Sequence, residues 1–186
     1  DKKINVPYPW GSPLSGIEDD KDGTGYYRRV VRWSPKGGHV FLVFGAVDYD
    51  CVVRVNGKEL GSHRGGYARF EFDVTGVWDR SGGNTIEVAA TDTSAGSQTY
   101  GKQGYGNARG IWQTVWLEAR PEAWIDSFFI KTSLDGEIAI SAELAGKCDG
   151  CVVDSDFGGV TASADVKDGR AELVFRIDEP ALWSPE

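Results

Sequence analysis

The sequence is poor in the residues that build metal centres and disulfide frameworks, with two histidines and three cysteines among 186 residues. An odd number of cysteines does not fit a disulfide framework. Cys148 and Cys151 form a Cys-x-x-Cys motif, but zinc would need two further ligands, and His39 and His63 lie far upstream. The redox form of this motif would need a helix that begins there. The Asp-Gly pair inside the motif is instead typical of a hairpin turn, so we expect no metal and no other cofactor.

The sequence also lacks long apolar runs, an excess of positive charge and any extended helical period. No apolar run approaches the roughly 18 residues of a transmembrane helix, and the first residues contain no signal-peptide core, so any signal was removed or never present. The net charge is −8, whereas a nucleic-acid-binding surface is expected to be basic. We therefore expect neither a membrane nor a nucleic-acid partner. What the sequence does contain, 25 glycines and 12% aromatic residues, predicts an all-β chain.

Short segments of β-branched and aromatic residues, separated by turns, predict the strands of a first sandwich. Residues 40–47 are almost continuously apolar, which predicts a central strand covered on both faces. Asn56-Gly57 separates two short apolar segments and predicts a hairpin. Residues 111–118 carry apolar side chains on both faces, so we expect one strand that is covered on both sides. Further strands are expected at residues 26–33, 70–74 and 86–91.

A second group of strands follows Arg120-Pro121. These segments are expected at residues 124–131, 137–144, 151–153, 160–166 and 171–177. Immunoglobulin-like sandwiches use about seven strands in roughly 100 residues, so five strands in a shorter stretch indicate a C-terminally truncated unit. We therefore predict two domains, residues 1–121 and residues 122–186.

The loop between Asp92 and Gly110 is long and rich in glycine. Loops of more than about 12–15 residues in a compact domain are usually functional, and this segment is the strongest candidate for a site. An acidic stretch at residues 18–23 is interpreted as a solvated turn, because the calcium-loop pattern lacks its final glutamate.

Several motifs, taken in order, resemble glycoside hydrolase family 2, which includes β-galactosidases, β-glucuronidases and β-mannosidases. The clearest is GIWQTVWLE at residues 110–118, preceded by Gly-Lys-Gln at residues 101–103, which resembles the end of that family's N-terminal jelly-roll domain. The other motifs are VPYPW at residues 6–10, YYRR at 26–29, the segment 47–57, GSHRGGY at 61–67, FDVT at 72–75 and PALWSP at 180–185.

The resemblance covers nearly the whole chain and implies both a fold and a limit on function. The implied fold is all-β, a jelly-roll (galactose-binding-domain-like) β-sandwich followed by a partial immunoglobulin-like β-sandwich. In the family, the two catalytic glutamates sit on a (β/α)8 barrel of about 250 residues, which this chain does not contain. The chain is therefore expected to be a non-catalytic N-terminal fragment of an exo-β-glycosidase, with a β-galactosidase-like enzyme as the first choice, and to have no catalytic residue of its own. Its expected partner is a carbohydrate substrate shared with the catalytic domain.

The resemblance also assigns roles in the long loop, because in the family this loop can reach the sugar pocket. Asp92 would accept hydrogen bonds from sugar hydroxyls, and Lys102 and Gln103 would donate to the sugar or support the loop. A second interpretation of Asp92 is that it caps the turn through an Asx hydrogen bond. The tryptophans could stack on sugar rings, but packing inside the sandwich is their commoner role.

Two other function classes stay open. The chain could be a stand-alone carbohydrate-binding module, since jelly rolls are common in lectins, or a structural adhesion fragment without a ligand. The acidic composition and glycine-rich β architecture suit a bacterial periplasmic or secreted protein, while the cysteine count fits the cytoplasm equally well. The sequence leaves the oligomeric state and the sugar open.

Overall fold

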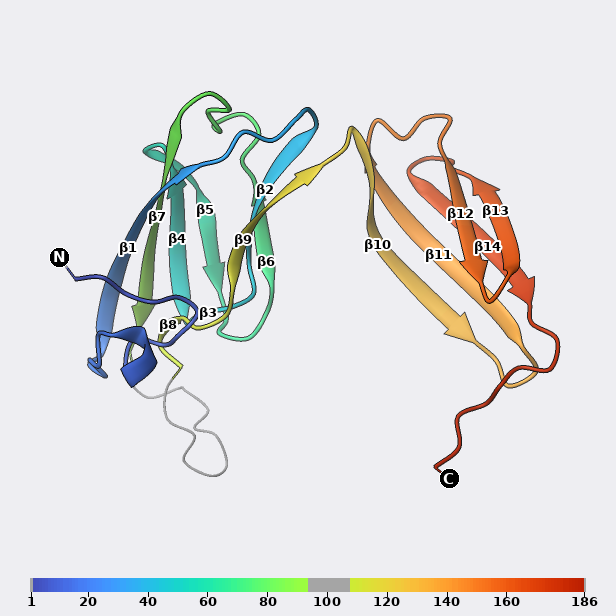
Figure 1. Ribbon diagram of the computed structural model, residues 1–186, viewed down its shortest axis with the longest axis horizontal. Helices are drawn as coiled ribbons and strands as arrows, with labels where there is room; N and C mark the ends of the chain where they lie inside the picture. The colour runs from blue at the N-terminus through green and yellow to red at the C-terminus, as the bar shows by residue number, and fades with distance from the viewer. Residues whose placement is uncertain (1, 94–107, 186) are drawn as a thin grey trace. The chain divides into compact units, whose positions relative to one another are not determined.

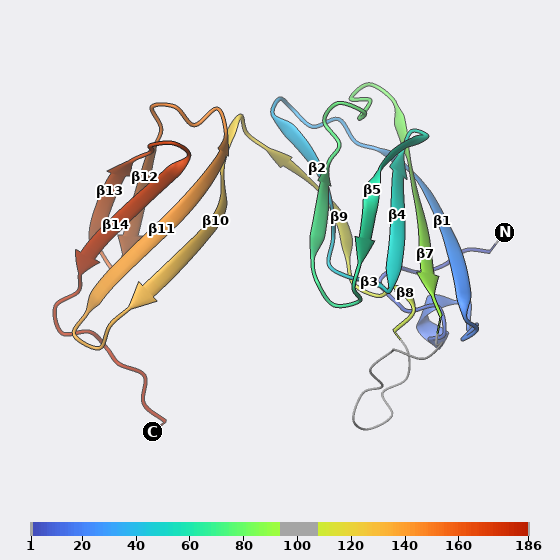
Figure 2. The ribbon, with the colours of Figure 1, turned by 180° about the vertical axis from the view of Figure 1, so that it is seen from behind.

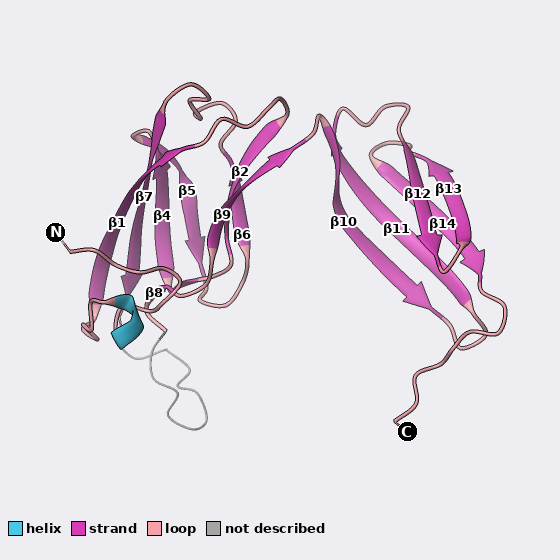
Figure 3. Ribbon diagram, in the orientation of Figure 1, coloured by secondary structure: helices cyan, strands magenta, loops and turns pink. Residues whose placement is uncertain are grey.

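A computed structural model describes residues 2–93 and 108–185 of the chain (Figure 1). The described residues form strands, turns and a single short 3-10 helix (Figure 3). Two compact units divide the chain, Asp1–Ala119 and Arg120–Glu186, and each is considered by itself. The predicted all-β fold class is confirmed.

The first unit is a sandwich of antiparallel strands. A four-stranded sheet has the order β1-β7-β4-β5, and a three-stranded sheet has the order β6-β2-β9 (Figures 1 and 2). A short pair, β3 with β8, completes the unit at one end. The strands are β1 Gly23–Arg32, β2 His39–Phe44, β3 Val47–Asp48, β4 Asp50–Val55, β5 Lys58–Arg64, β6 Phe70–Asp73, β7 Gly83–Asp92, β8 Gly110–Ile111 and β9 Val115–Arg120.

The core of this unit lies between the two larger sheets. In β4 every second residue is buried, with Cys51, Val53 and Val55 on the inner face. Strand β2 differs, because all five residues from 40 to 44 are buried. The prediction that this segment is covered on both faces is therefore confirmed. Trp10 from the N-terminal lead-in and Trp78 belong to the same core.

Local turn chemistry explains the hairpin between β4 and β5. Asn56 and Gly57 have φ angles of 53° and 78°, the left-handed conformation that both central residues of a type I′ turn require. The Asn56 side-chain amide also donates to the carbonyl of Val77 and to Asn84, both at 2.8 Å. The predicted hairpin is confirmed.

Two strands that were predicted to be continuous are broken, and the two breaks lie against each other. The segment 40–47 forms β2 and then β3, while the segment 111–118 forms β8 and then β9. The Gly45 N–H donates to the Thr114 carbonyl at 2.9 Å, and a side chain at Gly45 would lie 2.8 Å from the Cβ of Gln113. Both segments of the chain pass from one pair of strands to another at this point, as happens at the corners of sandwiches. The prediction of single strands was wrong at these positions.

The second unit contains the five strands that were predicted. They are β10 Ala123–Thr132, β11 Glu137–Gly146, β12 Val152–Phe157, β13 Val160–Asp165 and β14 Arg170–Arg176. One sheet has the order β10-β11-β14, and β12 pairs with β13. A small core of Val153, Ala171 and Leu173 lies between them. The Cys148–Cys151 motif forms a turn, as predicted, but it joins β11 to β12, which do not pair, so it is not a hairpin turn.

Candidate functional site

The segments that the sequence singled out meet at one end of the first unit. Figure 1 shows the end of β7, the short strands β3 and β8, and the 3-10 helix Pro13–Ser15 gathered there. Asp92 is the last residue of β7, and Asp48 is the last residue of β3. Asp48 also pairs in register with Gly110 of β8. Residues that lie far apart in the sequence therefore enter one small volume.

Arg109 is the centre of this end of the sandwich. Its side chain is only 4% exposed, and its Nε lies 3.4 Å from Oδ2 of Asp92, whose side chain is 0% exposed. The two terminal nitrogens of the guanidinium bind Oδ1 of Asp20 at 2.8 Å and Oδ1 of Asp22 at 2.5 Å. One buried cation is thus surrounded by three carboxylates, which offsets the large cost of burying its charge.

A fourth carboxylate, that of Asp48, is buried beside this cluster with 6% of its surface exposed. Burial and, to a smaller extent, the negative charge of Asp92 raise the pKa of Asp48 to about 6, against the opposing effect of Arg109. Gly66 packs directly on this carboxylate, since a methyl group at that position would collide with it. The site therefore contains one acid that changes its charge close to neutral pH.

Aromatic side chains lie beside Gly66, which packs on the Asp48 carboxylate. The Trp112 indole N–H donates to the Gly66 carbonyl at 2.7 Å. The ring of Tyr67 meets that of Trp112 edge-on, with 5.5 Å between centroids, and Tyr67 is 76% exposed. The Gly65-Gly66 turn thus lies between the buried carboxylate of Asp48 and the rings of Trp112 and Tyr67.

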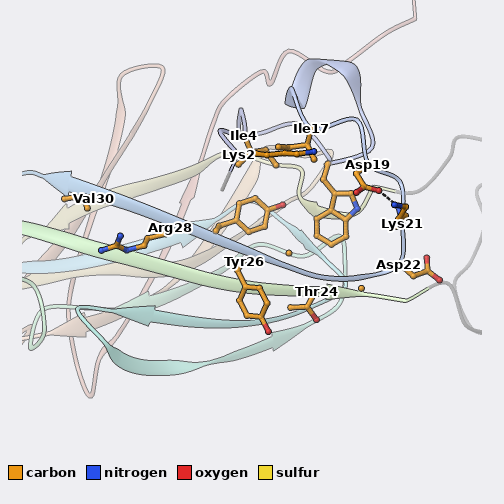
Figure 4. Close-up of a pocket in the computed structure, with 14 residues that line it drawn as sticks. Lys2, Ile4, Ile17, Asp19, Lys21, Asp22, Thr24, Tyr26, Arg28 and Val30 are labelled. Atoms are coloured by element: carbon orange, nitrogen blue, oxygen red, sulfur yellow. Dashed lines mark hydrogen bonds between the residues drawn. The ribbon is translucent and has the colours of Figure 1, made fainter.

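An open hollow of about 720 Å³ lies along β1 on the outside of the same end. Figure 4 shows Ile4 and Ile17 of the lead-in on one side of β1, with Thr24 and Tyr26 on the other. Asp22 lines this hollow and also binds Arg109. The hollow is therefore connected to the buried charge cluster through one shared carboxylate.

The structure describes one of the three residues that the sequence assigned to sugar binding. Asp92 lies at the end of β7 in the Arg109 cluster, whereas Lys102 and Gln103 lie outside the described residues. The acidic turn at residues 18–23 is more than a solvated turn, because Asp20 and Asp22 bind the buried guanidinium. The stretch is mostly exposed, as predicted, but its additional role could not be expected, since the partner of these acids lies almost 90 residues further along the chain.

Arg109 and Asp48 were missed by the sequence analysis. Arg109 directly precedes a glycine with φ of 78°, and a side chain at Gly110 would lie 2.6 Å from the ring of Trp10. The sequence alone shows only an arginine before a glycine, because the crowding at Gly110 exists only in the folded chain. The sequence around Asp48 gave no sign that this acid is buried, because a solvated acid at the end of a strand would also follow an apolar run.

The tryptophans mostly pack within the protein, as predicted. Trp10 and Trp78 are 7% and 6% exposed, and Trp33 meets Trp78 edge-on at 6.2 Å. The Trp116 indole donates to Glu118 at 2.7 Å, which gives that glutamate a structural partner. No group of three or more His, Cys, Asp and Glu side chains in the described parts of the chain is arranged to hold a metal ion. Among the same residues, no helix has the length and apolar character needed to cross a bilayer.

Comparisons with known proteins give this architecture a family. A family model described as "Glycosyl hydrolase 2 galactose-binding domain-like" matches residues 21–120. A β-galactosidase of Thermoanaerobacter pseudethanolicus is 29% identical, over 91% of this chain and 25% of that protein. A β-glucuronidase of Bacteroides fragilis is 33% identical, over 49% of this chain and 14% of that protein. This chain thus spans a quarter or less of the length of these relatives.

Solved structures show the same fold. A structure of Bifidobacterium dentium β-glucuronidase matches with a TM-score of 0.75 and 22% identity, over 98% of this chain and 38% of that one. A Faecalibacterium prausnitzii β-glucuronidase matches with a TM-score of 0.73 and 21% identity, over 98% of this chain and 36% of that one. With the family model matching more than half of its residues, the chain belongs to glycoside hydrolase family 2, and its first unit is the galactose-binding-domain-like sandwich of that family.

Proposed function

We propose that this chain is the N-terminal, non-catalytic part of an exo-β-glycosidase that removes terminal sugars from β-galactosides or β-glucuronides. The family membership supports the reaction class, and the names of the relatives support these two sugars. The chain would support the catalytic domain and contribute the segment 92–109 to its sugar pocket.

The carboxylates of the described site do not suit catalysis by this chain alone. A retaining glycosidase needs two carboxyl groups about 5–5.5 Å apart on either side of an accessible glycosidic bond. Asp48 and Asp92 are 6% and 1% exposed, so neither is open to a substrate in bulk water. Glu118 accepts a hydrogen bond from Trp116 and lies 3.8 Å from Arg69. We therefore assign the acid and the nucleophile to residues outside this chain.

The observation that carries the proposed role is the buried ion pair between Asp92 and Arg109. These two residues begin and end the long segment, and their side chains are bound to each other inside the unit. Asp20 and Asp22 hold the same guanidinium from the lead-in. An anchor of this kind fixes where the segment leaves and re-enters the sandwich, so that the polar residues Lys102 and Gln103 could be presented to a sugar. The burial of Asp92 favours this anchoring role over direct contact with the sugar.

The reaction class is tested with the protein as it occurs in its source cells. Purified protein would be assayed with the p-nitrophenyl β-glycosides of galactose, glucuronic acid and mannose, alongside the 186-residue chain alone. We expect hydrolysis of one of the first two substrates by the native protein and none by the chain alone. Turnover by the clean chain would refute the proposal. If the native protein hydrolyses nothing and the chain binds free sugars at millimolar concentration in calorimetry, the chain is a carbohydrate-binding module instead.

The anchoring role is tested with Asp92→Asn in the native protein. Loss of the buried negative charge that pairs with Arg109 is expected to lower kcat/KM by about 10- to 100-fold, and the melting temperature should fall with it. Asp149→Asn removes one exposed carboxylate from the second unit and should change neither quantity. A large loss of kcat/KM at an unchanged melting temperature would instead indicate that Asp92 contacts the sugar directly.

A further inference from the structure

The turn formed by Cys148 and Cys151 in the second unit takes no part in the proposed function. The Cys151 N–H donates to the Cys148 carbonyl at 3.1 Å, and Gly150 between them has a φ of 74°. These are the features of a four-residue β-turn, in which the first and last Cα atoms are less than about 7 Å apart. Disulfide bonds span Cα atoms separated by about 4.4–6.8 Å. The backbone therefore already holds the two cysteines at about the separation a disulfide needs.

Hydrogen bonds on both sides hold the ends of this turn in place. The Lys147 N–H donates to the Glu122 carbonyl at 2.7 Å, just before Cys148. The Val166 N–H donates to the carbonyl of Cys151 itself at 2.9 Å. Cross-linking the two thiols would thus require side-chain rotation with little movement of the chain.

The side chains are arranged suitably for stepwise oxidation. Cys148 is buried, whereas Cys151 is partly exposed and is open to a reagent from solution. The Cys151 Sγ lies 3.9 Å from the carbonyl of Lys147, the residue that precedes Cys148. The thiol of Cys151 is therefore folded back over the start of the turn, towards its possible partner.

We propose that Cys148 and Cys151 form a reversible disulfide that locks the connection between β11 and β12. The Cys151 thiolate attacks one sulfur of an oxidised low-molecular-weight disulfide, such as oxidised glutathione, and releases one reduced thiolate. The Cys148 thiolate then attacks Sγ of Cys151 and releases the second. Two protein thiols are oxidised, and one glutathione disulfide is reduced to two glutathione thiols.

The bond would join neighbouring parts of two different sheets. Strand β11 belongs to the β10-β11-β14 sheet, and β12 pairs with β13. The oxidised turn would hold the start of the β12–β13 hairpin against the end of β11. The state of this unit would then follow the redox conditions of its compartment, oxidised where disulfides persist and reduced in the cytosol.

The third cysteine provides an internal control. Cys51 is 3% exposed in the core of the first unit, and burial raises the pKa of its thiol to about 11. A buried, protonated thiol is a poor nucleophile. Cys51 should therefore stay reduced while the turn is oxidised.

The experiment uses the folded protein in graded ratios of oxidised to reduced glutathione. Samples would be alkylated with iodoacetamide after denaturation and their intact masses measured. At high oxidant we expect the protein to lose two hydrogen atoms and to carry one alkylated thiol, which peptide mapping would assign to Cys51. Dithiothreitol should restore three alkylated thiols.

Two variants complete the test. Cys51→Ala should be oxidised like the original protein, since both turn cysteines remain. Cys151→Ser should keep two alkylated thiols at every ratio. Three free thiols at high oxidant, a lasting glutathione adduct on Cys151, or disulfide-linked dimers of the original protein would each overturn the proposal.

Discussion

Replacing Asp48 with asparagine tests the electrostatics of the buried cluster. The side chain keeps its shape in Asp48→Asn, but it no longer ionises. Burial, together with the charge of Asp92, raises the pKa of Asp48 from 3.8 to about 6. Each unit of pKa shift corresponds to about 1.36 kcal/mol, so ionised Asp48 destabilises the folded chain by about 3 kcal/mol.

The sign follows from proton binding. Between pH 4 and pH 6 the folded protein keeps the Asp48 proton, whereas the unfolded chain has lost it, so the folded state binds more protons. The contribution of Asp48 to the free energy of unfolding therefore falls as the pH rises through this window. Below pH 4 Asp48 does not lower the free energy of unfolding, because it is protonated in both states. Above about pH 6 it is ionised in both states and lowers the free energy of unfolding by its full amount.

The predicted result is a difference between variant and original protein that depends on pH. Near pH 4 the two should unfold at similar urea concentrations. Above pH 6.5 the asparagine variant should be more stable by about 3 kcal/mol, because it cannot ionise; the attraction between the carboxylate and Arg109 is already contained in the raised pKa. Urea unfolding followed by tryptophan fluorescence, from pH 4 to pH 8, measures this difference.

Asp79→Asn is a control of opposite sign. Hydrogen bonds from the side chain and backbone of Ser81 lower the pKa of Asp79. Its ionised form stabilises the folded state, so the variant should lose stability at neutral pH, and the loss should shrink on acidification. If Asp48→Asn instead shifts stability equally at pH 4 and pH 7, the raised pKa of Asp48 is refuted.

Two further substitutions probe the same end of the sandwich. Arg109→Met leaves the buried Asp92 without its guanidinium partner and should lower the free energy of unfolding by about 3–5 kcal/mol, as measured by urea unfolding at pH 7; a loss below about 1 kcal/mol would contradict the anchoring role. Gly110→Ala places a methyl group against the ring of Trp10 at a positive φ and should cost about 1–3 kcal/mol. Gly76→Ala, where the added group meets no atom within 4 Å, should leave the melting temperature nearly unchanged.

The parts of the fold that depend on local chemistry could be predicted from the sequence. The hairpin at Asn56-Gly57 is set by two residues that accept positive φ. Strands β13 and β14 of the second unit follow alternating patterns of burial over six and seven residues. In both cases the determining interactions lie within a few residues of each other.

The broken strands could not be placed in the same way. The break at Gly45 is fixed by contacts with Gln113 and Thr114, almost 70 residues away. The glycine inside the apolar segment was a signal, because an isolated glycine in a strand often marks a bulge or a close approach of another backbone. The pattern of apolar residues alone was continuous on both sides of it.

The charge cluster around Arg109 was even harder to predict from the sequence. In the sequence, Asp20, Asp22 and Asp92 resemble ordinary loop acids, and the difference arises only because Arg109 is buried among them. With Asp48 added, four carboxylates lie around one guanidinium, and the local excess of negative charge is one reason why Asp48 keeps its proton up to about pH 6. Apolar packing would hold this end of the sandwich together but would not orient the chain, since dispersion and hydrophobic contacts are not directional. Hydrogen-bonded ion pairs to a planar guanidinium are directional, which suits the end of the sandwich where β7 ends and β8 begins.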